Sequence, residues 1–267
     1  MSMIISIVNF TKRLKDDDVQ TVIRAINQQV ALDFEPYWHM GATLRLEGAG
    51  TKLNRQAPQE LRGDAIIYLW DKAADVKDAV GYHEKTNSGL PYGFVFTEIA
   101  KELHEPWSVT LSHEVLELIA DPEVNILAAG PHPKHPARTV YFWYEMCDAV
   151  QDDRYRIAGV EVSNFVLPLY FTIAPEVGSR NDFLGRRVKG KVLQSFGVNP
   201  GGYVGFFDPS VGKVGKDVTF PADKRAARRL EIKDALGPAR RSVRYRNLDR
   251  MIRNGAARAA KAKGAHA

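Results

Sequence analysis

Two apolar runs near the N-terminus constrain the fold of this chain most strongly. Residues 3–10 and 64–70 carry large apolar side chains at most positions, which is typical of buried β-strands. Three consecutive aspartates at 16–18 suit the N-terminus of a helix. The apolar residues that follow recur at helical spacings of three and four: Val19, Val22, Ile23, Ile26 and Val30. With another strand at 42–47, we expect the chain to open with a strand, a helix and two further strands.

The middle of the chain continues this mixture of strands and helices. Residues 81–93 contain three glycines and a proline, which predicts a loop leading into a fourth strand at 94–99. A second helix is expected from Trp107 to Asp121, because Pro122 disfavours helical backbone in the residue before it. Beyond it the pattern predicts a rigid connector at 130–136, strands at 139–144 and 159–166, and an acidic turn at Asp152 and Asp153 between them.

Formal charge is distributed unevenly along the chain. The 267 residues carry +5 at neutral pH, but residues 224–263 hold fourteen Lys or Arg and three acidic residues, which gives that stretch +11. The remaining 23 basic and 29 acidic residues give the rest of the chain −6. The chain is therefore an acidic body with a basic tail, and its total charge does not indicate nucleic-acid binding by the whole protein.

Cysteine content and hydropathy narrow the possible cellular locations of the protein. The single cysteine, Cys147, excludes an intramolecular disulfide and a cysteine-rich zinc site. The basic residues Lys12 and Arg13 follow the N-terminal apolar run instead of preceding it, so this run is interpreted as a strand and not as a secretory signal. No window has the roughly 18 to 20 apolar residues that a membrane span needs. These features predict a soluble protein.

The predicted helix at 107–121 carries the clearest chemical motif. At about 100° per residue, Glu117 lies about 40° and Glu114 about 100° from His113 around the helix, with Thr110 and Asp121 in the same arc. Apolar residues occupy the opposite face: Leu111, Val115, Leu116, Leu118 and Ile119. His113 and Glu117 can thus reach one cation, and Glu114 is placed to hold a water molecule.

This motif has two interpretations. Any amphipathic helix places its charged residues on the solvent side, which needs no metal. The alternative is a variant of the zinc peptidase signature His-Glu-x-x-His, with Glu117 in the place of the second histidine. Zinc is then the expected metal, with iron or manganese as alternatives, because a carboxylate is a harder ligand than imidazole.

A third ligand is expected between residues 141 and 148. Glu145 and Asp148 follow a strongly apolar aromatic run, and carboxylates beside so much apolar surface are costly unless they are paired or bound to metal. We expect Glu145 to be the ligand and Asp148 either to support a ligand by hydrogen bonding or to take its place. Cys147, between them, is expected to be a small buried residue.

These motifs resemble a known family. Ser112-His113-Glu114-x-x-Glu117-x-x-x-Asp121-Pro122, followed by Glu145-x-x-Asp148, is similar to zincin-like metallopeptidases among bacterial and phage proteins, as is the loop before residue 94. A looser similarity extends to plant exordium-like proteins. The resemblance covers residues 64–170 and departs from established peptidases at Glu117.

The resemblance implies a fold, a mechanism and a substrate class. The fold would be a mixed sheet whose edge strand, here 94–99, binds a peptide or protein substrate by strand addition. The metal would polarise a water molecule that Glu114 deprotonates as general base. The candidates for stabilising the oxyanion are His83, Tyr82 and Tyr155.

We therefore expect an α+β protein in three parts. Residues 1–175 form a zincin-like metal-binding domain with an active-site helix, 176–222 a loop-rich, β-leaning appendage, and 223–267 a basic tail that is a helix or an arm ordered by a partner. The competing function is a non-catalytic structural or phage-particle protein whose tail binds nucleic acid or another polyanion without sequence preference. A cytoplasmic or virion-associated location is compatible with both functions. An alternative for the tail is that it binds no partner and is either a solvated arm or packed on the acidic body.

Overall fold

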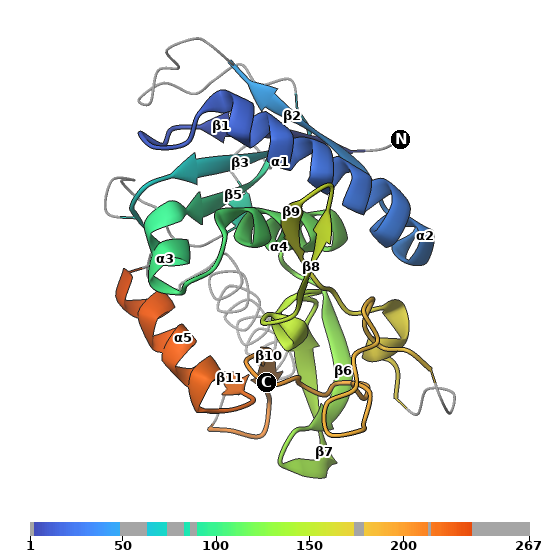
Figure 1. The fold of residues 1–267 in the computed structure, drawn as a ribbon. Helices are drawn as coiled ribbons and strands as arrows, with labels where there is room; N and C mark the ends of the chain where they lie inside the picture. The colour runs from blue at the N-terminus through green and yellow to red at the C-terminus, as the bar shows by residue number, and fades with distance from the viewer. Residues whose placement is uncertain are drawn as a thin grey trace, which may run out of the picture.

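The computed structural model describes residues 3–48, 63–73, 83–85, 90–173, 179–212 and 215–236. They form a mixed α/β fold. The two larger sheets have five strands and four strands, and the second is antiparallel. Figure 1 shows the first sheet toward one end of the molecule, the second toward the other, and helix α4 (Trp107–Ala120) between them. Within the described residues, no helix is both long and apolar enough to cross a membrane.

Four parallel strands form most of the first sheet. In sheet order these are β2 (Ala42–Glu47), β1 (Met3–Asn9), β3 (Ala65–Trp70) and β5 (Pro91–Phe96), and β4 (His83–Lys85) pairs antiparallel with β5 at the edge. Parallel strands are buried on both faces. Ile7 accordingly packs in the main core, while its neighbour Val8 belongs to a second apolar cluster. The strands predicted at 3–10, 42–47 and 64–70 are confirmed.

The fourth predicted strand differs in its limits and in its place. Strand β5 covers Pro91–Phe96 and lies between β3 and β4, so the prediction of an edge strand at 94–99 is wrong. Residues Thr97–Glu102 form helix α3 instead. Asp71, just after β3, holds the first turn of this helix. Its carboxylate accepts a hydrogen bond from the Thr97 hydroxyl (3.2 Å), and its backbone carbonyl accepts the backbone N–H of Glu98 (3.1 Å). The predicted loop at 81–93 likewise contains β4 and the first half of β5.

Helix α1 (Asp16–Gln29) follows β1 and covers one face of the sheet. The apolar face predicted for it is buried, and a π-helical turn, Val30–Phe34, continues it into α2 (Glu35–Trp38). The Asn27 side chain accepts the backbone N–H of Leu44 on β2 (2.7 Å) and donates to its carbonyl (3.0 Å). These bonds fix the helix to the sheet. Helix α4, the second predicted helix, packs against β5 and against β9 (Val160–Ser163), a strand of a small hairpin.

The second sheet joins segments that are distant in sequence. Its order is β11 (Lys216–Pro221), β10 (Tyr203–Asp208), β7 (His135–Trp143), β6 (Leu127–His132). The predicted connector at 130–136 is therefore wrong: these residues belong to the β6–β7 hairpin. Pro131 is tolerated there because β6 is an edge strand, where a missing N–H breaks no ladder. A separate hairpin pairs β8 (Arg154–Ile157) with β9 (Val160–Ser163).

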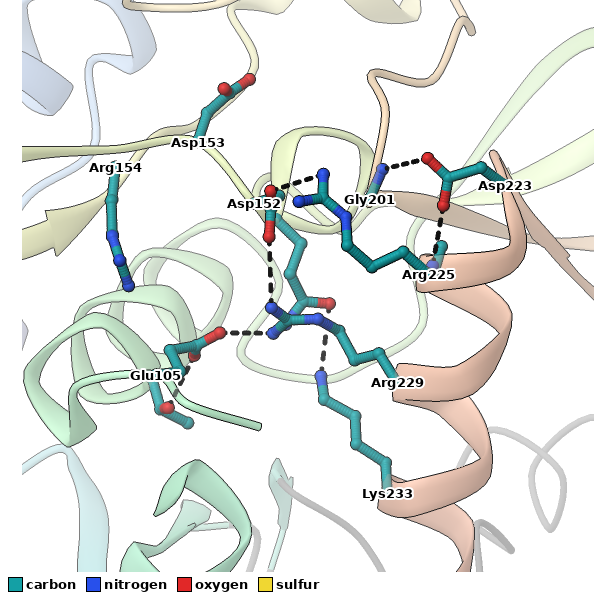
Figure 2. A network of polar contacts seen from close by, with 12 residues as sticks. Glu105, Asp152, Asp153, Arg154, Gly201, Asp223, Arg225, Arg229 and Lys233 are labelled. Carbon is teal, nitrogen blue, oxygen red and sulfur yellow. Dashed lines mark hydrogen bonds and ion pairs between the residues drawn. The ribbon is translucent and has the colours of Figure 1, made fainter. Parts of the chain in front are cut away.

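The start of the basic tail is an ordered helix, α5 (Lys224–Leu236), that packs on the body. Figure 2 shows its polar contacts: Arg225 pairs with Asp152 (2.6 Å), and Arg229 pairs with Glu105. The carboxylate of Asp223 accepts the backbone N–H of Ala226 (2.9 Å) at the beginning of the helix. Residues 237–267 lie outside the described part of the chain.

Candidate metal centre

The polar arc of α4 is buried. His113, Glu114 and Glu117 are only 4, 5 and 4 % exposed. The solvent-face interpretation of the motif is therefore wrong, because Cys147 and Asp148, which follow β7, contact this side of the helix. Asp121 has a local role, since its carboxylate accepts the backbone N–H groups of Asn125 (3.1 Å) and Ile126 (2.9 Å) where α4 ends.

Two carboxylates converge on one imidazole nitrogen. The Nε2 atom of His113 lies 3.1 Å from Oε2 of Glu117 and 3.3 Å from Oδ1 of Asp148. Two ligands that bind one tetrahedral zinc ion at its usual bond lengths are about 3.3 Å apart. The other Glu117 oxygen, Oε1, accepts the backbone N–H of Cys147 (3.1 Å), which fixes the orientation of this carboxylate.

Cys147 adds a third kind of donor atom. Its Sγ, a carboxylate oxygen of Glu117 and a ring nitrogen of His113 all lie within 4.8 Å of one another, and all three residues are buried. This group could hold a metal ion. Cys147 is buried as predicted, but its position beside His113 and Glu117 could not be predicted from helical spacing, because it lies outside α4.

The charges of these residues are coupled. Burial lowers the pKa of His113, but the negative charge of Glu117 and the hydrogen bonds with Asp148 and Glu117 outweigh burial and hold this pKa well above its usual value. Burial, and next the charge of Glu117, raise the pKa of the Cys147 thiol well above its usual value. The site thus attracts positive charge, which a proton on His113 or a divalent cation can supply.

Glu145 and Asp148, the two predicted downstream carboxylates, line a small pocket beside the centre. Its walls are mainly apolar, formed by Phe142, Trp143, Tyr170, Phe171, Val204 and Gly205. Asp148 therefore borders both the pocket and His113, whereas Glu145 is placed in the pocket wall and is not one of the three residues grouped around the possible metal position. The role of Glu145 as a ligand stays a prediction.

The appendage helps to position Asp148. Asp148 begins a short 3-10 helix, Asp148–Val150, which packs against β10. A Cβ atom added to Gly202 would lie 2.5 Å from the carbonyl oxygen of Ala149 and 2.9 Å from that of Asp148. Only glycine allows so close an approach, so the residues preceding β10 press directly on the backbone that carries the Asp148 side chain.

The oxyanion candidates have different outcomes. Tyr82 lies outside the described residues, and for His83 only its place in strand β4 is described. The hydroxyl of Tyr155 donates to Asp33 (2.7 Å) and accepts from Gln29 (3.2 Å). Burial and the hydrogen bond to Asp33 raise the pKa of Tyr155. Its proton is therefore already engaged in a buried network.

That network holds the helix that carries the centre. It was not predicted from the sequence. The Ser112 hydroxyl donates to Oε1 of Gln29 (2.7 Å) and accepts the backbone N–H of Ser163 (3.0 Å), while Gln29 donates to the Ser163 carbonyl (2.8 Å). Ser112 immediately precedes His113, so these bonds fix α4 against α1 and β9. The one available signal was Gln29 itself, a polar residue three positions after Ile26 on the apolar face of α1.

Comparisons with protein-family models, with curated proteins and with solved structures gave no match.

Proposed function

We propose that this protein is a zincin-like metal-dependent hydrolase that acts on peptides. The observation that carries the proposal is the convergence of Glu117 and Asp148 on Nε2 of His113, with Cys147 adjacent, in a buried site. The donor set of imidazole, carboxylate and thiol suits zinc best, with iron and manganese as alternatives. His113 and Glu117 would hold the ion, and the third ligand would come from residues 145–148.

The fold supports this proposal. A mixed sheet with an antiparallel edge strand, above a helix that carries the site, agrees with what the zincin resemblance implies. The edge that could pair with an extended peptide is β4 in place of the strand expected at 94–99. A small pocket lies beside the site, and Asp148, one of the two carboxylates next to Nε2 of His113, is part of its wall.

Each residue has a defined task in this mechanism. A bound metal would supply Lewis acidity toward water and the scissile carbonyl. Glu114, next to His113 on α4 and 5 % exposed, takes the proton from the attacking water and passes it to the leaving amine. The hydrogen bonds of Ser112 and the Cys147 N–H hold His113 and Glu117 in place.

The variant Glu114→Gln tests the catalytic part of the proposal. It keeps the shape of the side chain and removes the base, so we expect bound zinc to stay at the wild-type level while peptide cleavage falls by about 10² or more. Zinc is measured by mass spectrometry of the metal, and cleavage by mass spectrometry of products from a mixed peptide library. Glu102→Gln, at an exposed position of α3, is the matched control. Equal cleavage by both variants would refute the assignment of Glu114.

A second candidate function concerns the end of the tail. In α5, Arg225, Arg228 and Arg229 already form ion pairs within the protein. Residues 237–263 still carry nine Lys or Arg against one acidic residue, a charge of +8. We propose that these residues, and not α5, bind nucleic acid or another polyanion in the manner of a structural or particle protein.

Truncation after Leu236 tests this second function. The shortened chain keeps α5 and its ion pairs with the body, and circular dichroism checks that it stays folded. Its affinity for double-stranded DNA should lose the steep salt dependence expected of up to nine phosphate contacts. Binding is measured by fluorescence anisotropy between 50 and 300 mM salt. If truncation leaves the slope of affinity against salt unchanged, the tail does not bind polyanions.

A further inference from the structure

We propose that Cys147 is a metal ligand, so that the centre consists of His113, Glu117 and a thiolate. This inference rests on the proposed function and specifies its metal. It differs from the ligand set that the motif alone predicts, in which Glu145 or Asp148 is the third ligand. The starting point is the grouping of the three donor atoms within 4.8 Å of one another.

The backbone of Cys147 already holds the site together. Its N–H donates to Oε1 of Glu117 (3.1 Å), and its thiol donates to the backbone carbonyl of His113 at a sulfur–oxygen distance of 3.8 Å. These two bonds reach both ligand positions of α4, across 30 and 34 positions of sequence. Cys147 is therefore fixed directly beside the turn of helix that separates His113 from Glu117.

The surroundings of Cys147 are those of a ligand. A free buried cysteine commonly acts as a small apolar side chain. This one is fully buried, but its surroundings are polar: its Sγ lies within 4.8 Å of a ring nitrogen of His113 and of a carboxylate oxygen of Glu117. A metal ion at the centre of these three donor atoms would bind the thiolate and the carboxylate together.

A thiolate ligand determines which metal is selected. Sulfur favours zinc and other softer ions over manganese, magnesium and calcium, which prefer oxygen. Three protein ligands leave the fourth tetrahedral position open for water, as a catalytic zinc site requires. Asp148, 3.3 Å from Nε2 of His113, would then support the centre without being one of its ligands.

Cobalt substitution of the full-length protein tests this inference. The chain has one cysteine, so a thiolate-to-cobalt charge-transfer absorption in the near ultraviolet can come from no other residue. We expect one equivalent of Co²⁺ to produce this band in the wild type and in Asp148→Asn. In Cys147→Ser the band should disappear, and the affinity for zinc should fall by about 10-fold or more, with little change in affinity for manganese.

The possible outcomes separate this inference from the proposed function. If the wild type binds Co²⁺ or Zn²⁺ without a charge-transfer band, the thiolate assignment is overturned and an oxygen ligand takes its place. If the wild type binds neither ion, the proposed function itself fails. X-ray absorption of the zinc-loaded wild type gives an answer that needs no variant, because a zinc–sulfur distance of about 2.3 Å supports the thiolate and a shell of nitrogen and oxygen alone contradicts it.

Discussion

Alanine in place of His113 is expected to remove zinc binding entirely. His113 Nε2 is the atom on which Glu117 (3.1 Å) and Asp148 (3.3 Å) converge, so its loss removes the only imidazole from the group of donor atoms that it forms with Glu117 and Cys147. Bound zinc should fall from one equivalent per chain to none after dialysis, as measured by mass spectrometry of the metal. His135→Ala, at an exposed position in the β6–β7 hairpin, should keep the full equivalent.

The same substitution should destabilise the metal-free protein. His113 there provides the positive charge between two buried carboxylates, and its protonated form is favoured because its pKa is raised. Breaking such a buried pair costs about 3 to 5 kcal/mol. Far-UV circular dichroism separates unfolding from simple loss of metal. A folded His113→Ala protein that still holds one equivalent of zinc would exclude this site as the metal centre.

Methionine in place of Arg229 is expected to detach α5 from the body. The guanidinium contacts Glu105 and lies 3.4 Å from Oδ1 of Asp152 (Figure 2), and the side chains of Arg229 and Glu105 are only 11 and 6 % exposed. Methionine preserves the apolar stem but leaves Glu105 buried without its principal cation. The free energy of unfolding in urea should fall by about 3 kcal/mol.

Arg228→Met is the matched control for this prediction. Arg228 lies on the same helix but is 71 % exposed and pairs with Glu231, which is 64 % exposed. Such pairs contribute about 0 to 1 kcal/mol. The double variant Glu105→Gln/Arg229→Met should lose less stability than the two single losses added together, because it buries no unpaired charge. If Arg229→Met and Arg228→Met unfold at the same urea concentration, the ion pair does not hold α5.

The Glu105 pair also predicts a pH dependence. Burial alone would raise the pKa of Glu105, but the charges of Arg229 and Lys233 and the hydrogen bonds from Arg229 and Thr110 lower it below its usual value of 4.5. A lowered carboxyl pKa contributes stability that is present above pH 4.5 and is lost as the pH falls through the folded-state pKa. In Arg229→Met, the part of the acid-induced loss of stability that comes from the Glu105 pair should be absent.

The Glu105 contacts lie close to the proposed centre. Besides Arg229 on α5, its carboxylate accepts a hydrogen bond from the hydroxyl of Thr110 (2.8 Å), which occupies the same arc of α4 as His113. The start of the basic tail is therefore attached to the helix that carries the site.

Local sequence patterns determined helices α1 and α4 and many of the strands. The limits of α4, the apolar face of α1 and the apolar runs of β1 and β3 each follow from residues a few positions apart, which share one helix face or one strand. The sequence likewise determined that His113, Glu114 and Glu117 lie on one side of a helix. Periodicity could not show whether that side faces solvent, because charged residues follow the same spacing in both cases.

Only the tertiary structure decided what covers the charged side of α4. Cys147 and Asp148 lie 30 or more residues beyond the helix residues they contact, and Gln29 reaches Ser112 across 83 positions. Contacts between distant segments also decided the order of the strands in each sheet, the edge position of β4 and the pairing of β10 with β7. The physical reason is that spacing along a chain fixes which side chains share a face, whereas the partner of that face is chosen by packing between distant segments.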